Sequence, residues 1–167
     1  GKSKLAGERR LARLCPNHQT FRIAWLYGTH GINFPKSIAR HARRLAAGNA
    51  PLRVVNDQRG TPTCTLDVCR QVLAMIDKDQ TGLFHCTAEG ACTWYDFARR
   101  VVQACGIDVQ MSPCTTDEFP RPAPRPANSV LANTRLSELG LNLMPPWEQG
   151  FENFLNSGGK AALRAQE

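Results

Sequence analysis

Residues 21–34 read Phe-Arg-Ile-Ala-Trp-Leu-Tyr-Gly-Thr-His-Gly-Ile-Asn-Phe, and they contain the clearest structural signal in the chain. The aromatic and aliphatic side chains of residues 21–27 predict a buried strand that ends at Gly28. A loop with a second glycine follows, and Pro35 then opens a helix that ends near Gly48. This order of strand, loop and helix is the unit from which α/β folds are built.

The alternation of strands and helices continues along the rest of the chain. Further strands are expected at 52–56, 82–87 and 109–113. Further helices are expected at 3–14, 65–77 and 93–105, and from Pro145 onward. The alternation predicts an α/β fold in which at least some strands pair in parallel.

Three of these helices have apolar residues at helical spacing, which predicts the side that each one buries. The helix at 93–105 is expected to begin with a capping box formed by Thr93 and Asp96. The predicted apolar faces are Leu66, Cys69, Leu73 and Ile76 in the helix at 65–77; Trp94, Phe97, Val101 and Cys105 in the helix at 93–105; and Trp147, Phe151, Phe154 and Leu155 in the last helix.

The composition is that of an ordinary globular chain of one domain. The chain has 167 residues, of which 42% are apolar and 21% charged, and its mean hydropathy is −0.36. No apolar run approaches the roughly 18 residues that a membrane span needs, so no membrane association is expected. The seven cysteines are an odd number and never form a CxxC pair, which favours a reducing, cytoplasmic location and argues against a metal site.

The positive charge is concentrated in the first third of the chain. The formal net charge is +7, and residues 1–50 contain ten Lys and Arg residues against one acid, Glu8. Solvated helix faces, a small phosphorylated ligand and a nucleic acid could each account for such a distribution. No aromatic residues alternate with these charges to form a stacking platform, so a nucleic-acid partner is not expected.

Several stretches together resemble one family in their order and spacing. They are residues 1–8, 22–34, 54–63, 82–85, 93–98, 125–131 and 146–147. The chain is similar, from residue 1 to about 156, to the dTDP-4-dehydrorhamnose reductases, which are extended short-chain dehydrogenase/reductases. The resemblance implies the C-terminal part of a Rossmann fold that binds NADPH or NADH, together with a smaller sugar-nucleotide-binding domain. Residues 1–34 would end the Rossmann domain, residues 35–156 would mainly bind substrate, and residues 157–167 are expected to be a loose tail.

The resemblance also implies roles for individual residues. The family has a YxxxK signature, and Gly1-Lys-Ser-Lys4 matches only its end, so Lys4 would be the catalytic lysine and would also contact the cofactor. The tyrosine and the glycine-rich loop would precede residue 1, so the chain is expected to be the back part of a longer protein and inactive alone. Trp25, Arg125 and Ser129 would bind the dTDP-sugar substrate.

The expected activity of the longer protein is reduction of dTDP-4-dehydro-L-rhamnose to dTDP-L-rhamnose by hydride transfer from NAD(P)H, as in O-antigen biosynthesis. The alternatives are a non-catalytic regulator, resembling the β subunit of methionine adenosyltransferase, and a basic nucleic-acid module. Whether the longer protein forms a homodimer is left open. Turn formation accounts for Asp57, Gln58 and Thr63 without a ligand.

Overall fold

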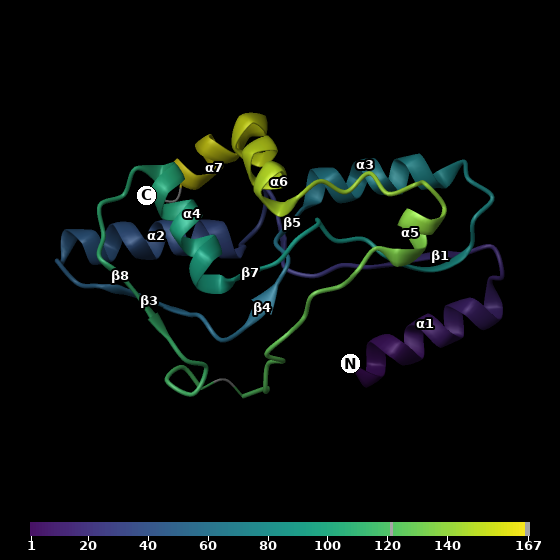
Figure 1. The fold of residues 1–167 in the computed structure, drawn as a ribbon, viewed down its shortest axis with the longest axis horizontal. Coiled ribbons are helices and arrows are strands. Elements are labelled where there is room, and N and C mark those ends of the chain that lie inside the picture. The colour runs from purple at the N-terminus through teal and green to yellow at the C-terminus, as the bar shows by residue number, and fades with distance from the viewer. Residues whose placement is uncertain (121, 166–167) are drawn as a thin grey trace.

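The computed structural model describes residues 1–120 and 122–165 (Figure 1). The helices are α1 (Lys2–Leu14), α2 (Phe34–Ala47), α3 (Thr65–Ile76), α4 (Trp94–Cys105), α5 (Thr134–Glu138), α6 (Trp147–Phe154) and α7 (Lys160–Arg164), with a kinked turn, η1 (Leu155–Gly159), between the last two. The strands are β1 (Gln19–Arg22), β2 (Leu26–Tyr27), β3 (Leu52–Val55), β4 (Arg59–Gly60), β5 (Thr63–Cys64), β6 (Gly82–His85), β7 (Cys92–Thr93) and β8 (Met111–Cys114). Within the described ranges, no helix combines the length and apolar character needed to cross a membrane.

The strands form short pairs, and most of the pairs are parallel. β1 pairs with β6, β2 with β5 and β3 with β8 in parallel, whereas β4 and β7 are antiparallel. In the first pair, Gln19 lies opposite Gly82 and Arg22 lies opposite His85. Parallel neighbours need a long crossover connection, and each crossover here contains at least one helix. The prediction of an α/β fold with parallel pairing is confirmed.

The predicted strand at 21–27 is two strands, and the break lies at Trp25. The backbone of Trp25 has a φ of +48°, in the left-handed region that residues with a Cβ rarely occupy. A residue in this conformation cannot continue an extended ladder, so β1 ends at Arg22 and β2 begins at Leu26. The break matters for function because it places the Trp25 side chain outside both strands.

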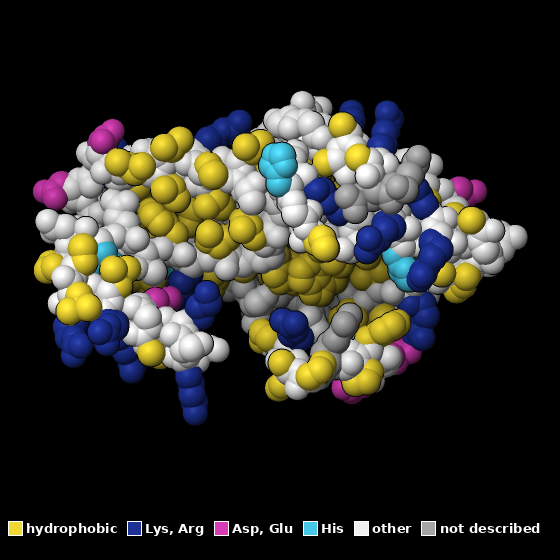
Figure 2. All heavy atoms as spheres, turned by 180° about the vertical axis from the view of Figure 1, so that it is seen from behind, with side chains coloured by type: hydrophobic (Ala, Val, Ile, Leu, Met, Phe, Trp, Pro, Cys, Tyr) yellow, Lys and Arg dark blue, Asp and Glu magenta, His cyan; other side chains and the backbone are white. Residues whose placement is uncertain are grey.

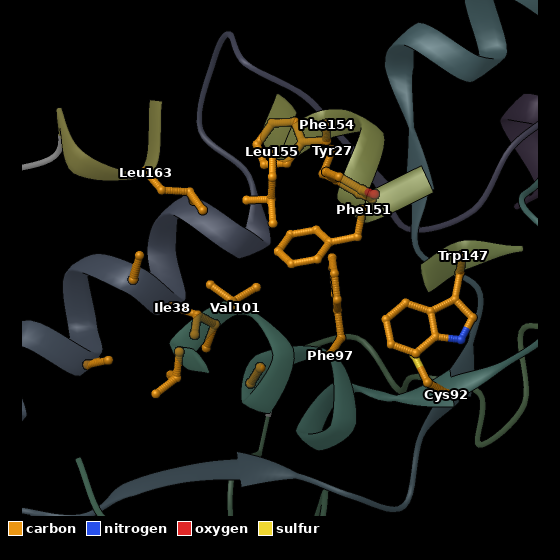
Figure 3. Packing of buried hydrophobic residues seen from close by; sticks show 14 of the residues in the cluster. Tyr27, Ile38, Cys92, Phe97, Val101, Trp147, Phe151, Phe154, Leu155 and Leu163 are labelled. Atoms are coloured by element: carbon orange, nitrogen blue, oxygen red, sulfur yellow. The ribbon is translucent and has the colours of Figure 1, made fainter. Parts of the chain in front are cut away.

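The main hydrophobic core lies at one end of the molecule, between α2, α4, α6, η1 and α7 (Figures 1 and 3). Four aromatic rings meet at its centre: the ring centroid of Tyr27 lies 5.3 Å from that of Phe97 and 5.2 Å from that of Phe154, and Phe151 lies 5.5 Å from Phe97. A smaller cluster of Met75, Phe84 and Leu136 fills the space around β6, α3 and α5.

Helix α4 confirms the predicted capping box, and it buries two of the four residues of its predicted apolar face. The Thr93 hydroxyl accepts from the backbone N–H of Asp96, and the Asp96 carboxylate accepts from the backbone N–H of Thr93. Phe97 is fully buried, as expected. Trp94, in contrast, is only half-buried, because it lies at the start of the helix with its ring against Trp25 and Phe34.

Helix α3 forms where it is predicted, but its predicted apolar face is wrong. The exposed residues are Leu66, Cys69, Leu73 and Ile76, and the buried ones are Asp67, Val68, Gln71 and Met75. Gln71 can be buried because its amide donates to the carbonyl of Leu141, at 2.9 Å, and accepts from the N–H of Leu143, at 2.7 Å. An amide with a partner on both its nitrogen and its oxygen avoids much of the usual penalty for burying a polar group, so apolar spacing alone selects the wrong side.

The prediction of a loose tail at 157–167 is also wrong over residues 157–165, and residues 166–167 lie outside the described chain. Ser157 and Gly158 bend the chain, and Gly158 has a φ of +94° that suits glycine. The bend turns α7 back onto the core, where Leu163 is 1% exposed and its carbonyl accepts from the Arg43 guanidinium at 2.9 Å. Burial of Leu163 offsets part of the entropy lost when this segment is ordered.

Helix α1 lies at the end of the molecule away from α2 and α4 (Figure 1) and buries none of its residues. A two-pronged ion pair ties it to β1: Arg22 Nε donates to Glu8 Oε1 at 3.0 Å, and Arg22 Nη2 donates to Glu8 Oε2 at 2.6 Å. The hydrogen bond from Arg22 is the main reason why the pKa of Glu8 lies below its ordinary value.

We predict that truncation of Leu163 destabilises the whole chain. Leu163→Ala should lower the free energy of unfolding by about 3 kcal/mol, because it removes a buried side chain and leaves a cavity. Urea unfolding followed by circular dichroism measures the loss. Leu73→Ala is the matched control, since Leu73 is 65% exposed in α3. Equal losses in the two variants would show that α7 does not dock on the core.

We also predict that the docking of α1 weakens in acid. Because the pKa of Glu8 is lowered in the folded chain, its contribution is present above its unfolded pKa and is lost as the pH falls through the folded value. NMR chemical shifts of α1 should change over that range. Glu8→Gln should show the acid-like shifts at neutral pH, whereas Glu138→Gln, in α5, should not. If the chemical shifts of α1 change neither with pH nor in Glu8→Gln, the prediction is contradicted.

Candidate ligand-binding site

A cavity of about 800 Å³ opens on one face of the molecule. Figure 2 shows this face, with a hollow that is floored by hydrophobic side chains and has Lys and Arg side chains along its edge. The lining residues are Trp25, Phe34, Ile38, His41, Leu52, Arg53, Val54, Val55, Gln58, Trp94, Phe119, Arg125, Pro126 and Ser129. They come from the break between β1 and β2, one side of α2, strand β3 with the turn after it, the start of α4 and the proline-rich segment at 119–129. The cavity therefore exists only in the folded chain.

Two stacked indoles form the centre of the cavity wall. The rings of Trp25 and Trp94 are nearly parallel, at 7°, with centroids 3.5 Å apart, and Phe34 lies 4.4 Å from Trp94. Gly60 makes room for this stack, because a Cβ at that position would lie 2.2 Å from Cε2 of Trp25. The contacts hold the Trp25 side chain in place in spite of its strained backbone.

The N–H group of each indole has a partner within the protein. Trp25 Nε1 donates to Ser129 Oγ at 3.1 Å, and Ser129 Oγ in turn donates to the carbonyl of Arg59 at 3.0 Å. Trp94 Nε1 donates to Gln58 Oε1 at 3.2 Å. The polar atoms fix the orientation of the rings, so what the two indoles present to the cavity is apolar ring surface.

The loop after β8 is fastened beside the cavity by hydrogen bonds to a preceding turn. Asp57 accepts from the backbone N–H of Thr116 at 2.9 Å and from its hydroxyl at 2.7 Å, and Gln58 Nε2 donates to the same hydroxyl at 2.9 Å. These bonds lower the pKa of Asp57 below its ordinary value. Arg53 pairs with Glu118 in this loop and lies over the Phe119 ring, 5.8 Å from its centroid.

The charged groups around the cavity favour an anion. Arg125 forms no ion pair with any residue that the structure describes, so its guanidinium is available to a ligand. Burial, and then the nearby Arg44 guanidinium, lower the pKa of His41 below its ordinary value. The described lining contains no carboxylate. The cavity therefore suits a ligand that has an apolar or flat part and an anionic group.

The structure brings together three of the four residues singled out from the sequence. Trp25, Arg125 and Ser129 line the same cavity, although Ser129 uses its hydroxyl within the protein. Lys4 does not belong to this group, because it lies on α1 and is exposed. Hydrogen bonds with Thr116 account for Asp57, and Thr63 is buried with its hydroxyl bonded to the carbonyl of Thr61 at 3.1 Å.

Sequence reasoning missed Trp94, Phe34 and His41 as parts of the cavity. Trp94 was assigned to the core because it shares a helical face with Phe97. The sequence does contain one signal that Trp94 differs from Phe97: it is the first residue of α4. The first residue of a helix can lie beyond the core that the later turns cover. Phe34 and His41 share one face of α2 at a spacing of seven residues, but nothing in the sequence shows that β3 lies opposite them.

Comparison with known sequences identifies close relatives of the chain. The family model for the RmlD substrate binding domain matches residues 1–159. A dTDP-4-dehydrorhamnose reductase of Mycolicibacterium smegmatis is 36% identical over 156 residues, which cover 92% of this chain and 46% of that protein. The protein of the same name from Escherichia coli is 36% identical over 169 residues, covering 93% and 54%. The chain thus spans about half the length of the curated relatives that it matches.

Solved structures agree with this assignment. A dTDP-4-dehydrorhamnose reductase from Clostridium acetobutylicum matches with a TM-score of 0.86 and 44% identity, over 93% of this chain and 54% of that one. A second, from Bacillus anthracis in complex with NADP, matches with a TM-score of 0.85 and 33% identity, over 94% and 54%. Since the family model covers nearly the whole sequence and these structures share its fold, the chain belongs to the RmlD substrate binding domain family.

Proposed function

We propose that this chain is the sugar-nucleotide-binding part of a dTDP-4-dehydrorhamnose reductase. The observation that supports the proposal best is the single cavity of about 800 Å³ that holds Trp25, Arg125 and Ser129 together. Relatives at 36% identity are named for this activity. A nucleoside diphosphate sugar has the flat base, the apolar ring faces and the anionic diphosphate that the cavity suits.

The proposed roles follow from the geometry of the cavity. The Trp25 ring would pack against the sugar, because its N–H already donates to Ser129 and only its apolar surface is free for a ligand. Ser129 would act by fixing that ring. Arg125 would bind the diphosphate, since its guanidinium forms no ion pair among the described residues and matches phosphate oxygens.

Lys4 is the residue that would connect this chain to the cofactor. It lies on the solvent-exposed helix α1 and forms no ion pair with any described residue, so its ammonium is free to contact groups from outside this chain. A bound nicotinamide would supply the hydride, and NADPH and NADH both fit the proposal. Lys4 would favour the ionised form of a nearby phenol and donate a hydrogen bond to the ribose.

The overall reaction would be the reduction of a 4-keto sugar, with a hydride added to C4 and a proton to its oxygen. The chain would hold the sugar nucleotide and contribute Lys4, while the tyrosine and the dinucleotide-binding loop would come from the preceding half. We therefore propose that the chain alone is inactive. A cytoplasmic location and a homodimer stay predictions. If the whole protein binds dTDP-rhamnose but does not reduce the 4-keto sugar, the alternative of a regulator without catalytic activity is favoured.

We predict that the chain binds dTDP-rhamnose and that two substitutions weaken this binding. Arg125→Ala should weaken it about tenfold by removing charge-assisted hydrogen bonds, and Trp25→Ala should weaken it by a similar factor by removing the packing surface. Isothermal titration calorimetry measures both. Arg99→Ala is the matched control, because Arg99 is exposed and does not line the cavity. Unchanged affinity in both cavity variants would refute the assignment.

We also predict the effect of Lys4→Met in the full-length reductase. Turnover should fall about a hundredfold and NADPH should bind more weakly, because activation of the phenol and a ribose contact are lost together. Steady-state kinetics and cofactor titration measure the two effects. Lys2→Met is the control, since Lys2 is exposed on the same helix. Turnover that survives Lys4→Met would remove Lys4 from the proposed mechanism.

A further inference from the structure

Three buried side-chain oxygen atoms have no hydrogen-bond partner among the residues that the structure describes: Thr20 Oγ1, Tyr27 Oη and Asp67 Oδ2. The last two lie near each other, beside helix α6. Tyr27 is 2% exposed and Asp67 is 4% exposed, so bulk water does not reach either group. The other carboxylate oxygen, Asp67 Oδ1, accepts from Arg70 at 3.0 Å. A buried polar atom without a partner is costly, and native proteins rarely retain one.

Both oxygens face the same side of Gly150. A Cβ built on Gly150 would lie 3.1 Å from Asp67 Oδ2 and 3.9 Å from Tyr27 Oη, with Pro145 Cγ at 3.8 Å. One small group beside Gly150 can therefore reach both oxygens with little adjustment. Figure 3 shows Tyr27 close to Phe151 and Phe154 of α6, the helix to which Gly150 belongs.

The backbone does not explain why residue 150 is glycine. Gly150 lies inside α6 and is not among the residues with positive φ, so an alanine there would have the better helix propensity. A Cβ at this position would crowd Asp67 Oδ2, so the glycine keeps a methyl group away from the two unpartnered oxygens.

We propose that a single buried water molecule binds beside Gly150 and bridges Tyr27 to Asp67. The water accepts from the Tyr27 hydroxyl and donates to Asp67 Oδ2, which gives both orphan atoms a partner. It joins the end of β2, the first turn of α3 and the middle of α6. The site is separate from the ligand cavity, whose lining contains none of these three residues. The proposal therefore does not depend on the proposed function.

A high-resolution crystal structure of the chain tests the proposal directly. The expected result is a well-ordered water within hydrogen-bond distance of Tyr27 Oη and Asp67 Oδ2. A Tyr27 hydroxyl bonded directly to Asp67, with no water beside Gly150, would overturn it.

A double-mutant cycle gives a second and independent test. Gly150→Ala places a methyl group where the water binds and should raise the equilibrium constant for unfolding roughly tenfold, although alanine favours the helix. Tyr27→Phe removes one partner of the same water. Because both changes disrupt one bridge, the double variant should be little less stable than Gly150→Ala alone.

Additive effects in the cycle would overturn the proposal, as would a Gly150→Ala chain that is as stable as the unaltered one. Gly7→Ala is the matched control, because a Cβ on Gly7 in α1 meets nothing within 4 Å. This variant should unfold no more readily than the unaltered chain. If Gly150→Ala does not fold, the crystal structure of the unaltered chain still decides between the two outcomes.

Discussion

The stacking of Trp25 on Trp94 is the contact on which the candidate site depends. The 3.5 Å stack holds Trp25 in a left-handed backbone conformation, and that conformation ends β1 and lets β2 begin in a new direction. Backbone strain of this kind persists only where the surroundings over-determine it. Here the surroundings are an indole on one side, the missing side chain of Gly60, and the hydroxyl of Ser129.

A second layer of hydrogen bonds holds the rest of the cavity around this stack. Ser129 ties the end of the proline-rich segment to the carbonyl of Arg59, and Gln58 connects Trp94 to Thr116. Proline restricts the backbone of that segment before any ligand binds, which lowers the entropy lost on binding. The arrangement is that of a preformed binding site.

The two ends of the molecule differ in how completely they are packed. Around α2, α4 and α6, aromatic rings and the returning α7 form a continuous core. At the other end, α1 buries nothing and α3 exposes Leu73 and Ile76. The buried polar groups of α3 also differ from each other. Backbone groups bond both the nitrogen and the oxygen of the Gln71 amide, whereas Asp67 has one oxygen without a partner among the described residues.

Local sequence was enough to predict the longer strands and helices in their order, the capping box at Thr93 and the resemblance to one family, but not the two-residue strands or the short helices α5 and α7. These features depend on residues within a few positions of one another, or on the order of short motifs. Three features depended on the tertiary structure: the break at Trp25, the buried side of α3 and the docking of α7. Each is decided by partners far away in the chain, such as Ser129 for Trp25, 104 residues apart. Helical spacing shows where apolar side chains lie, but only the folded chain determines which polar groups find a partner and can be buried.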